Sequence, residues 1–352
     1  MSNSSPTEIL THPAASLQGP CCLRWERFLQ RLPGPAPSLA WLPILQRAMA
    51  HRPLLVEARR GEETVGLLPL AAMNSVCFGK FLISLPYLNS AGVRATEPAV
   101  AHAMIDEAVR LADTLNVRYL ELRQECEWQH PRLRDRLTSK VHMRLDLPPT
   151  DAQLWTQLSS KVRNQIRKGE RQGFSVRWGG AELLDAFYAV FSHNMRDLGT
   201  PVYGKGFFRC ILQEFPSTAE LCCLQAAGRT VSAALLLHQG QQTEVPSASS
   251  LRAFHSRNAN MLLYWHLLQR AIERGSSRFD FGRSTRDSNT YRFKKQWGAQ
   301  PSPAIWQYYL RQGRCDALRP ESGRYALPIR IWQRLPLPLT RCLGPFLVRG
   351  IP

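Results

Sequence analysis

The stretch LCCLQAAGRTVSAALLLH, residues 221–238, decides the fold class of this chain. Two apolar runs flank a turn at Gly228 and Arg229, which is typical of a β-hairpin. A third apolar run follows at 243–249, then an amphipathic helix at about 258–274 and a strand at 278–281. The predicted order is therefore three strands, a helix and a strand.

The same order occurs earlier in the sequence. Apolar runs predict strands at 54–59, 64–73 and 81–88. An amphipathic pattern then predicts a helix at 99–115, and a further apolar run predicts the closing strand at 119–123. First and last strands are separated by roughly 60 residues in both copies, within the range of one α/β unit. The sequence thus predicts an internal repeat of two similar α/β halves.

Length and composition agree with two globular domains, since 352 residues with 44% hydrophobic residues suit two cores. Three further helical segments are predicted between the repeats, at 151–172, 181–198 and 204–215. The expected organisation is a flexible N-terminus at 1–20, a first half at 21–148, a second half at 149–315 and a basic apolar tail at 316–352.

The formal net charge of +18 predicts attraction to polyanions such as RNA, nucleotide diphosphates or an anionic membrane surface. No leader and no apolar stretch of about 18 residues is found, so we expect a cytoplasmic protein without a transmembrane segment. Nine cysteines lack metal-ligand spacing, so we expect reduced thiols and no metal site.

The C-terminal residues 325–352 combine arginines with apolar residues and contain no acid. This pattern resembles an interfacial contact, which would place the protein peripherally at the inner face of the membrane. Packing of the same apolar residues across the two domains is the alternative, and it is the one that we favour from the sequence.

Three stretches resemble one family: SKVRNQIRK at 160–168, NMRDLGTPVY at 194–203, and FDFGRS at 279–284 running into YRFKKQWG at 291–298. Together they resemble the FemAB-like proteins of exosortase (PEP-CTERM) systems, which belong to the GNAT superfamily of N-acyltransferases with BioF2-like acetyltransferase domains. Supporting strings lie at 244–250 and 260–265, so the similarity covers roughly residues 40 to 350.

The resemblance implies an α/β (α+β) fold of tandem GNAT-like domains, each a mixed, mostly antiparallel sheet flanked by helices. It also implies transfer of an acyl or aminoacyl group to an amine, near exopolysaccharide or envelope glycan synthesis. Acyl-CoA or aminoacyl-tRNA would be the co-substrate, without a tightly bound cofactor. Two alternatives stay open: an acyl-CoA-dependent N-acetyltransferase of an amino sugar carried on a nucleotide or lipid diphosphate, and an inactive GNAT-like module that binds polyanions.

The candidate catalytic residues lie in and after the strand at 278–281. Asp280 alternates with two phenylalanines, so it faces away from them and could accept a proton or orient an amine; the alternative is a structural carboxylate paired with Arg283 or Arg278. The remaining catalytic candidates follow in an expected loop and are Tyr291, Lys294 and Lys295; the same loop carries Arg283 and Arg292 as candidate substrate- or anion-binding residues.

Within that loop, residues 293–298 match the F-K-x-x-(W/F)-G pattern of FemAB-type enzymes. The resemblance implies that Lys294, with Lys295 as the alternative, lies near the transferred group and holds a phosphate or the developing oxyanion. The competing interpretation is that Tyr291 packs the domain edge and both lysines are solvated.

Candidate anion-binding residues form three groups. At the start of the helix near 258, Arg257, Asn258 and Asn260 stand where GNAT enzymes carry a glycine loop for the pyrophosphate of coenzyme A, and both glycines are missing. A basic helix carries Lys161, Arg163, Asn164, Arg167 and Lys168, which predicts a polyanion stripe unless the face is merely solvated. The third group is Asn194, Arg196 and Tyr203, either a substrate-positioning loop or a network at a helix end. No Ser-His-Asp order indicates a nucleophilic hydrolase.

Overall fold

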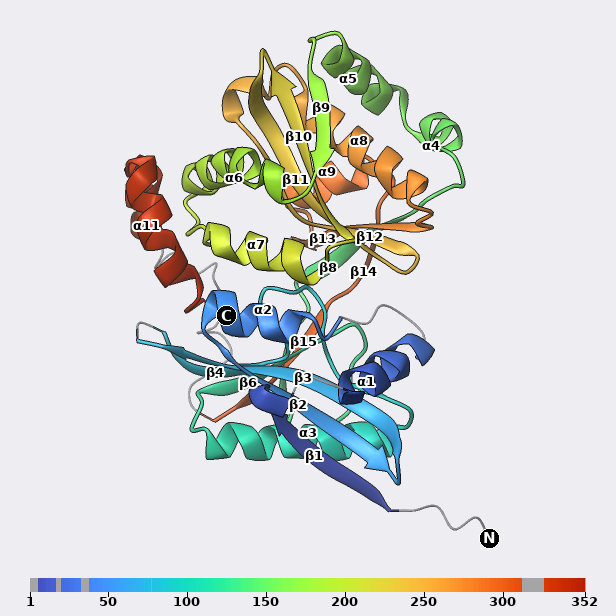
Figure 1. Cartoon of the computed structure of the whole chain (residues 1–352), viewed down its shortest axis with the longest axis vertical. Coiled ribbons are helices and arrows are strands. Elements are labelled where there is room, and N and C mark those ends of the chain that lie inside the picture. Colours follow the sequence, from blue (N-terminus) through green and yellow to red (C-terminus); the bar gives the residue numbers. More distant parts are fainter. Residues whose placement is uncertain (1–5, 17–19, 33–37, 77, 312–325, 352) are drawn as a thin grey trace. The chain divides into compact units, whose positions relative to one another are not determined.

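The computed structural model describes residues 6–16, 20–32, 38–76, 78–311 and 326–351 (Figure 1). The chain divides into two compact units, each built around one sheet. Unit 1 comprises Met1–Ser139, Pro303–Ser322 and Arg349–Pro352, and unit 2 comprises Lys140–Ser302 and Gly323–Val348.

Unit 1 contains a sheet in the order β1-β2-β3-β4-β6-β15-β7, with β5 pairing β3. Its strands are β1 (Thr7–Pro13), β2 (Arg52–Arg60), β3 (Glu63–Ser75), β4 (Gly79–Ile83), β5 (Arg94–Ala95), β6 (Tyr119–Gln124), β7 (Asp135–Leu137) and β15 (Ile305–Leu310). All pairs are antiparallel except β4 with β6, which is parallel.

Helix α3 (Pro98–Thr114) covers one face of this sheet, and η1 (Ala14–Ser16), α1 (Pro20–Arg31) and α2 (Trp41–Met49) complete the unit. Proline is favoured at the first helical position, where its missing N–H has no partner anyway, and Pro98 begins α3. Val100, Met104 and Ile105 then recur at helical spacing and are buried against the strands.

Unit 2 contains a seven-stranded sheet in the order β14-β8-β13-β12-β11-β10-β9. Its strands are β8 (Lys140–Asp146), β9 (Ser175–Gly179), β10 (Ala219–Ala226), β11 (Arg229–Gln239), β12 (Gln242–Ser250), β13 (Arg278–Thr285) and β14 (Gln300–Pro303). The pair β12–β13 is parallel.

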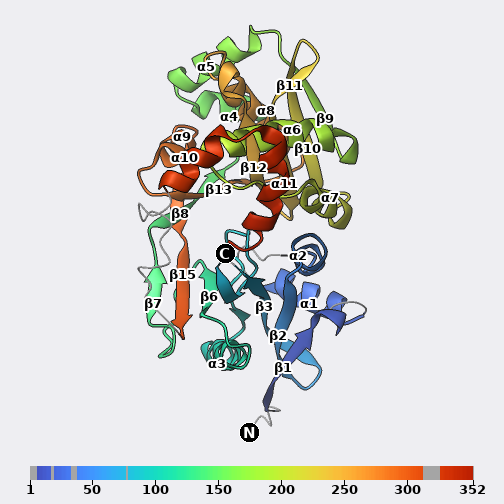
Figure 2. The same ribbon diagram turned by 90° about the vertical axis from the view of Figure 1, so that its left-hand side faces the viewer.

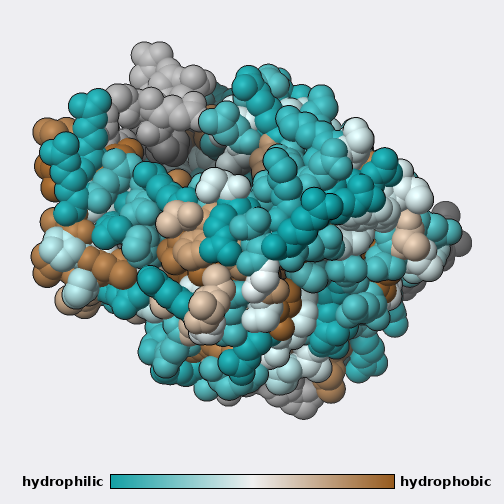
Figure 3. Space-filling model, turned by 90° about the horizontal axis from the view of Figure 1, so that it is seen from above, coloured by the Kyte–Doolittle hydropathy of each residue, from teal (hydrophilic) through white to brown (hydrophobic). Residues whose placement is uncertain are grey.

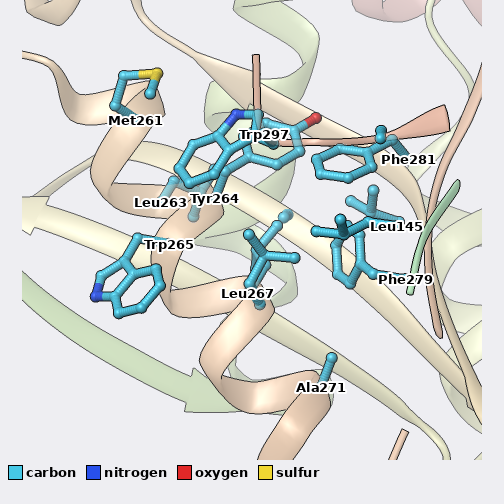
Figure 4. Close-up of a cluster of buried hydrophobic side chains, with 14 of the residues drawn as sticks. Leu145, Met261, Leu263, Tyr264, Trp265, Leu267, Ala271, Phe279, Phe281 and Trp297 are labelled. Carbon is cyan, nitrogen blue, oxygen red and sulfur yellow. The ribbon is translucent and has the colours of Figure 1, made fainter. Parts of the chain in front are cut away.

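The helices of unit 2 are α4 (Asp151–Gln157), α5 (Ser160–Glu170), η2 (Ala181–Leu183), α6 (Leu184–Leu198), α7 (Lys205–Glu214), η3 (Arg252–Phe254), α8 (Ala259–Glu273), α9 (Asn289–Lys295), α10 (Ala326–Arg334) and α11 (Leu337–Val348). Helix α8 packs on the sheet, α5 packs on α8, and α6 also covers the sheet. The core under α8 is aromatic: Tyr264 stacks on Phe281 and lies beside Trp297 (Figure 4).

The predicted strand–strand–strand–helix–strand order is confirmed in both units, as is the class of mixed sheets flanked by helices. The segment expected to be one helix at 151–172 is two, because Ser159 caps a new helix with its side chain. Tyr291 through Lys295 lie on helix α9 and not in a loop; Ser288 caps this helix by accepting from the Tyr291 N–H.

The expected domain boundaries were wrong for three strands. Strand β1 lies within the N-terminus that was expected to be flexible, and its seven residues pair with β2. Strand β8, expected in the first half, pairs with β13 in the second sheet. Strand β15, expected in the second half, pairs with β6 and β7 in the first. Each of these pairings joins segments far apart in sequence, which local periodicity does not reveal.

Candidate active site

The main feature of unit 2 is a gap between two neighbouring strands. Within the described residues, β12 and β13 pair over only three positions, from Gln242 opposite Arg278 to Glu244 opposite Asp280. Beyond this point β12 continues beside β11 to Ser250, while β13 continues beside β8. The facing edges of β12 and β13 are then no longer paired with each other, so an extended ligand could lie between them.

Unit 1 contains the same three-position parallel pair, between β4 and β6. Here the following segment, residues 84–91, returns to the neighbouring strand: the N–H of Ser84 donates to the carbonyl of Glu121 and the N–H of Ala91 donates to that of Arg123, both at 2.9 Å. The backbone of residues 84–91 therefore pairs with β6 in unit 1, at the place where β12 and β13 separate in unit 2.

Lys294 of α9 lies near the point where β12 and β13 separate, since it interacts electrostatically with Glu244 and Asp280, the last paired positions. It is 8% exposed, and its Nζ donates to the carbonyls of Gly282 (3.1 Å) and Arg283 (3.0 Å) on β13. Burial lowers the pKa of Lys294 to about 8; Asp280 opposes this shift and Arg283 adds to it. An ammonium has three donors, so these two carbonyls leave one for a ligand.

Asp280 is held from two sides and is buried. Its Oδ1 accepts from the N–H of Gly282 at 2.7 Å, and its Oδ2 accepts from Nε of Arg144 at 2.9 Å. The carboxylate is thus paired with Arg144 of β8, whereas the sequence suggested Arg283 or Arg278; Arg278 forms an ion pair with Asp146. This arrangement favours a structural role for Asp280, because both oxygens already accept strong hydrogen bonds.

The neighbouring candidates on α9 separate into buried and exposed residues. Tyr291 is buried in the core below the helix. Lys295 and Arg292 are exposed, and Nζ of Lys295 lies 5.9 Å from the centroid of the Tyr291 ring. Of the two lysines, only Lys294 contacts the backbone of β13.

Arg257, before α8, is committed to other contacts. Its Nε donates to Oε1 of Gln172 at 2.9 Å and its Nη2 donates to the Gln172 carbonyl at 3.0 Å. The guanidinium also lies 4.9 Å from the ring centroid of Phe174 and 5.3 Å from that of Phe254. Arg257 thereby connects η3 to the segment after α5 and is poorly placed to hold a phosphate.

The start of α8 is crowded by α5. A Cβ on Gly169 would lie 3.0 Å from Cβ of Leu262 and 3.3 Å from the carbonyl oxygen of Asn258, so a larger residue here would require α5 or α8 to shift by a few tenths of an ångström. Asn258 itself has a left-handed φ of 57°, and Oδ1 of Asn260 accepts from Ser250 Oγ at 3.3 Å. These residues do not fit the glycine-lined cradle that binds the pyrophosphate of coenzyme A in GNAT enzymes.

The opposite side of α5 is the predicted basic stripe. Val162, Ile166 and Gly169 face inward. Lys161, Asn164, Arg167 and Lys168 are exposed, and Arg163 is partly buried, donating to the Trp155 carbonyl at 3.4 Å. Within the described residues, none of the four cations on this helix forms an ion pair with an acid.

The third predicted group does not act together. Nδ2 of Asn194 donates to Ser249 Oγ at 3.1 Å, so Asn194 reaches the end of β12. Arg196 instead donates to Oδ1 of Asp197 at 2.7 Å, as expected of a network at a helix end. The ring of Tyr203 lies in an aromatic cluster, 5.0 Å from that of Phe207.

Sequence reasoning did not identify Arg144 or Ser284. Ser284 lies on β13 beyond the Gly282 irregularity, is 4% exposed, and its Oγ has no hydrogen-bond partner among the described residues. A buried hydroxyl without a partner is uncommon and marks a position where a ligand atom could bind. Ser284 ends one of the stretches that carried the family resemblance, which was the available signal.

Other features of the described residues do not add a site. A depression of about 380 Å³ lies away from the strand gap, between α7, η2 and β10. In the part of the chain that the structure describes, no cluster of three or more His, Cys, Asp or Glu is placed to hold a metal ion. Among the described helices, none has both the length and the apolar character needed to cross a membrane.

Comparison with known protein families identifies the segment that contains the strand gap. Residues 157–295 match the model of the acetyltransferase (GNAT) domain. This segment of unit 2 is therefore similar to the acetyltransferase (GNAT) domain family. The match includes β12, α8, β13 and α9, and therefore both edges of the gap and Lys294. A search of curated protein sequences finds no match to the chain.

Solved structures show that the GNAT fold extends over both units. FemX is 13% identical over 83% of this chain and 96% of its own, with a TM-score of 0.63. A tandem GNAT protein from the clavulanic acid biosynthesis pathway is 12% identical over 88% of this chain and 100% of its own, with a TM-score of 0.55. The C-terminal domain of a putative lysylphosphatidylglycerol synthetase from Agrobacterium fabrum is 13% identical over 84% of this chain and 93% of its own, with a TM-score of 0.55. At these identities the likeness shows the fold alone, a tandem GNAT architecture.

Proposed function

We propose that this tandem GNAT protein transfers an acyl or aminoacyl group to an amine, and that the reaction takes place in unit 2. The observation that carries this proposal is the contrast between the two units. Beyond Glu244, β12 and β13 are no longer paired and Lys294 lies near the point where they separate, whereas residues 84–91 return to β6 at the equivalent place in unit 1.

The proposed reaction needs little from the protein beyond positioning and charge. The acceptor amine attacks the carbonyl carbon of an ester or thioester, a C–N bond forms, and the carbonyl oxygen becomes an oxyanion until the C–O or C–S bond breaks. The departing oxygen or sulfur takes up the proton that the amine loses. Lys294, aimed by two carbonyl contacts, would donate its remaining N–H to the oxyanion.

The residues around the gap support a donor other than coenzyme A thioesters. The start of α8 is crowded by α5, and Arg257 is bound to Gln172. The exposed cations of α5 would suit a long polyanion, so an aminoacyl ester of tRNA is the donor that we favour. The acceptor would be an amine of an exopolysaccharide or envelope glycan precursor, whose nucleotide or lipid diphosphate could bind the same cations.

A conventional N-acetyltransferase is the second candidate, since the matching family model describes an acetyltransferase domain. The two donors can be distinguished directly. Purified protein would be incubated with acetyl-CoA, longer acyl-CoAs or charged tRNA, together with amino-sugar nucleotides, and the products analysed by mass spectrometry.

The matched variants are Lys294→Met, at the gap, and Lys295→Met, on the exposed side of the same helix. We expect transfer from charged tRNA, lost in Lys294→Met and retained in Lys295→Met. Transfer from acetyl-CoA would support the second candidate. Absence of product with every donor, combined with tRNA binding that both variants retain, would replace the enzyme by a polyanion-binding module.

A further inference from the structure

The two C-terminal helices carry an unusual share of exposed apolar surface. Ten large apolar side chains are exposed in the described part of the chain, and six of them lie on α10 and α11, which have only 9 and 12 residues. A seventh, Leu198, ends α6 beside Gly199, where Ile329 fills the space. We call these seven residues the tail patch: Leu198, Leu327, Ile329, Ile331, Leu339, Leu343 and Phe346.

On α10 and α11, the tail patch forms the outer side, and the inner side of both helices is packed against the protein. Trp332, Thr340 and Val348 are buried, and Nε of Arg341 donates to Ser192 Oγ of α6 at 2.9 Å. In Figure 2, α10 and α11 lie in front of α6. Packing against α6, within unit 2, therefore accounts for one side of the tail and leaves the other side unexplained. Figure 3 shows hydrophobic surface along the edge of unit 2 at which α11 lies in Figure 1.

The surroundings of the tail patch are positively charged. Residues 326–351 contain no Asp or Glu. Arg330 and Arg334 are exposed on α10 among the apolar residues. Arg252 is close to α10, because the two share a hydrogen-bond acceptor. Nη2 of Arg252 and Nε2 of Gln333, which lies on α10, both donate to the carbonyl of Asp197. Apolar side chains interspersed with arginine match the boundary between anionic headgroups and acyl chains.

We propose that the tail patch docks unit 2 onto the surface of an anionic phospholipid bilayer. The helices would lie in the interface without crossing it, since both are short and Pro345 lies inside α11. A symmetric dimer through this patch would bring the exposed Arg330 and Arg334 of two copies together, and this like-charge repulsion disfavours a second copy as the occupant. This inference is independent of the proposed reaction.

The test is flotation of the full chain with vesicles of phosphatidylcholine alone, or of phosphatidylcholine with phosphatidylglycerol at about three to one. A tail variant combines Ile331→Ser, Leu343→Ser and Phe346→Ser. A matched apolar control combines Leu23→Ser and Val76→Ser, two exposed residues elsewhere. A charge control combines Lys161→Gln and Lys168→Gln on α5.

We expect wild-type protein to partition onto vesicles that contain phosphatidylglycerol, with affinity lowered at least about tenfold in the tail variant and unchanged in the apolar control. Partial retention in 1 M salt would report the apolar contact, because such salt screens charges beyond about 3 Å. Three results would overturn the proposal: equal binding by the tail variant, binding abolished by the charge control alone, or lipid-free dimers in light scattering that the tail variant abolishes.

Discussion

Lys294 is a buried amine whose charge changes near the pH of ordinary assays. Its pKa of about 8 means that the ammonium is present below pH 8 and is lost above it. If the ammonium stabilises the oxyanion, kcat should fall above about pH 8. Lys294→Met should lower kcat by about 10²–10³ and abolish this alkaline decline, whereas Lys295→Met should keep it. If kcat of Lys294→Met declined above pH 8 as it does in the wild type, the decline would have to come from the titration of another group.

Glu220 is the carboxylate on which acid stability should depend most. Burial alone would raise the pKa of Glu220, but hydrogen bonds from His238, Arg270 and Arg274 outweigh it and lower the pKa to about 2 from an ordinary 4.5. Because the folded pKa is depressed, this stabilisation is complete above about pH 4.5 and is lost as pH falls toward 2.

The variant Glu220→Gln should therefore lower the free energy of unfolding at pH 7 by roughly 2 kcal/mol, since it removes the charge that pairs with the buried His238 and the partly exposed Arg270 and Arg274. Its unfolding free energy should also change less between pH 4.5 and 2 than that of wild type. Urea titrations at several pH values measure both effects. Glu170→Gln, on the exposed side of α5, is the control; an equal loss there would contradict a specific role for Glu220.

At the scale of elements, the contact between α5 and α8 depends on one glycine. A Cβ at Gly169 would come within 3.0 Å of Leu262, so Gly169→Ala should push the basic helix outward. We expect a loss of about 1–3 kcal/mol in unfolding free energy from overpacking, and weaker polyanion binding. Gly206→Ala on α7, where an added Cβ meets nothing, should be neutral or slightly stabilising. Equal thermal stability of both variants would show that α5 is free to move.

The elements that the sequence predicted are those with local signals. Alternating apolar runs around Gly228 define a hairpin, and helical spacing defines α8. At the site, a motif drew attention to Lys294, whereas the partner of Asp280 is Arg144, 136 residues away in sequence. The open and closed strand gaps were also beyond prediction, because they depend on whether residues 84–91 return to β6.

At the scale of the whole molecule, unit 1 is completed by a late segment. Strand β7 pairs with β15, and β15 lies between β6 and β7. A fragment of residues 1–139 should therefore expose the edge of β6 and aggregate. Adding a peptide of residues 303–311 should restore solubility and protect β6 amides from hydrogen exchange. A monomeric, protected fragment without the peptide would show that β15 is dispensable.

The late position of β15 also affects how the chain emerges from the ribosome. The first sheet stays incomplete while all of the sequence from β8 to β14 is being translated. At a translation rate of about 5–20 residues per second, this delay is on the order of ten seconds or more, and during it the first unit lacks β15. Nascent chains should therefore bind chaperones at the β6 edge until residue 310 leaves the exit tunnel.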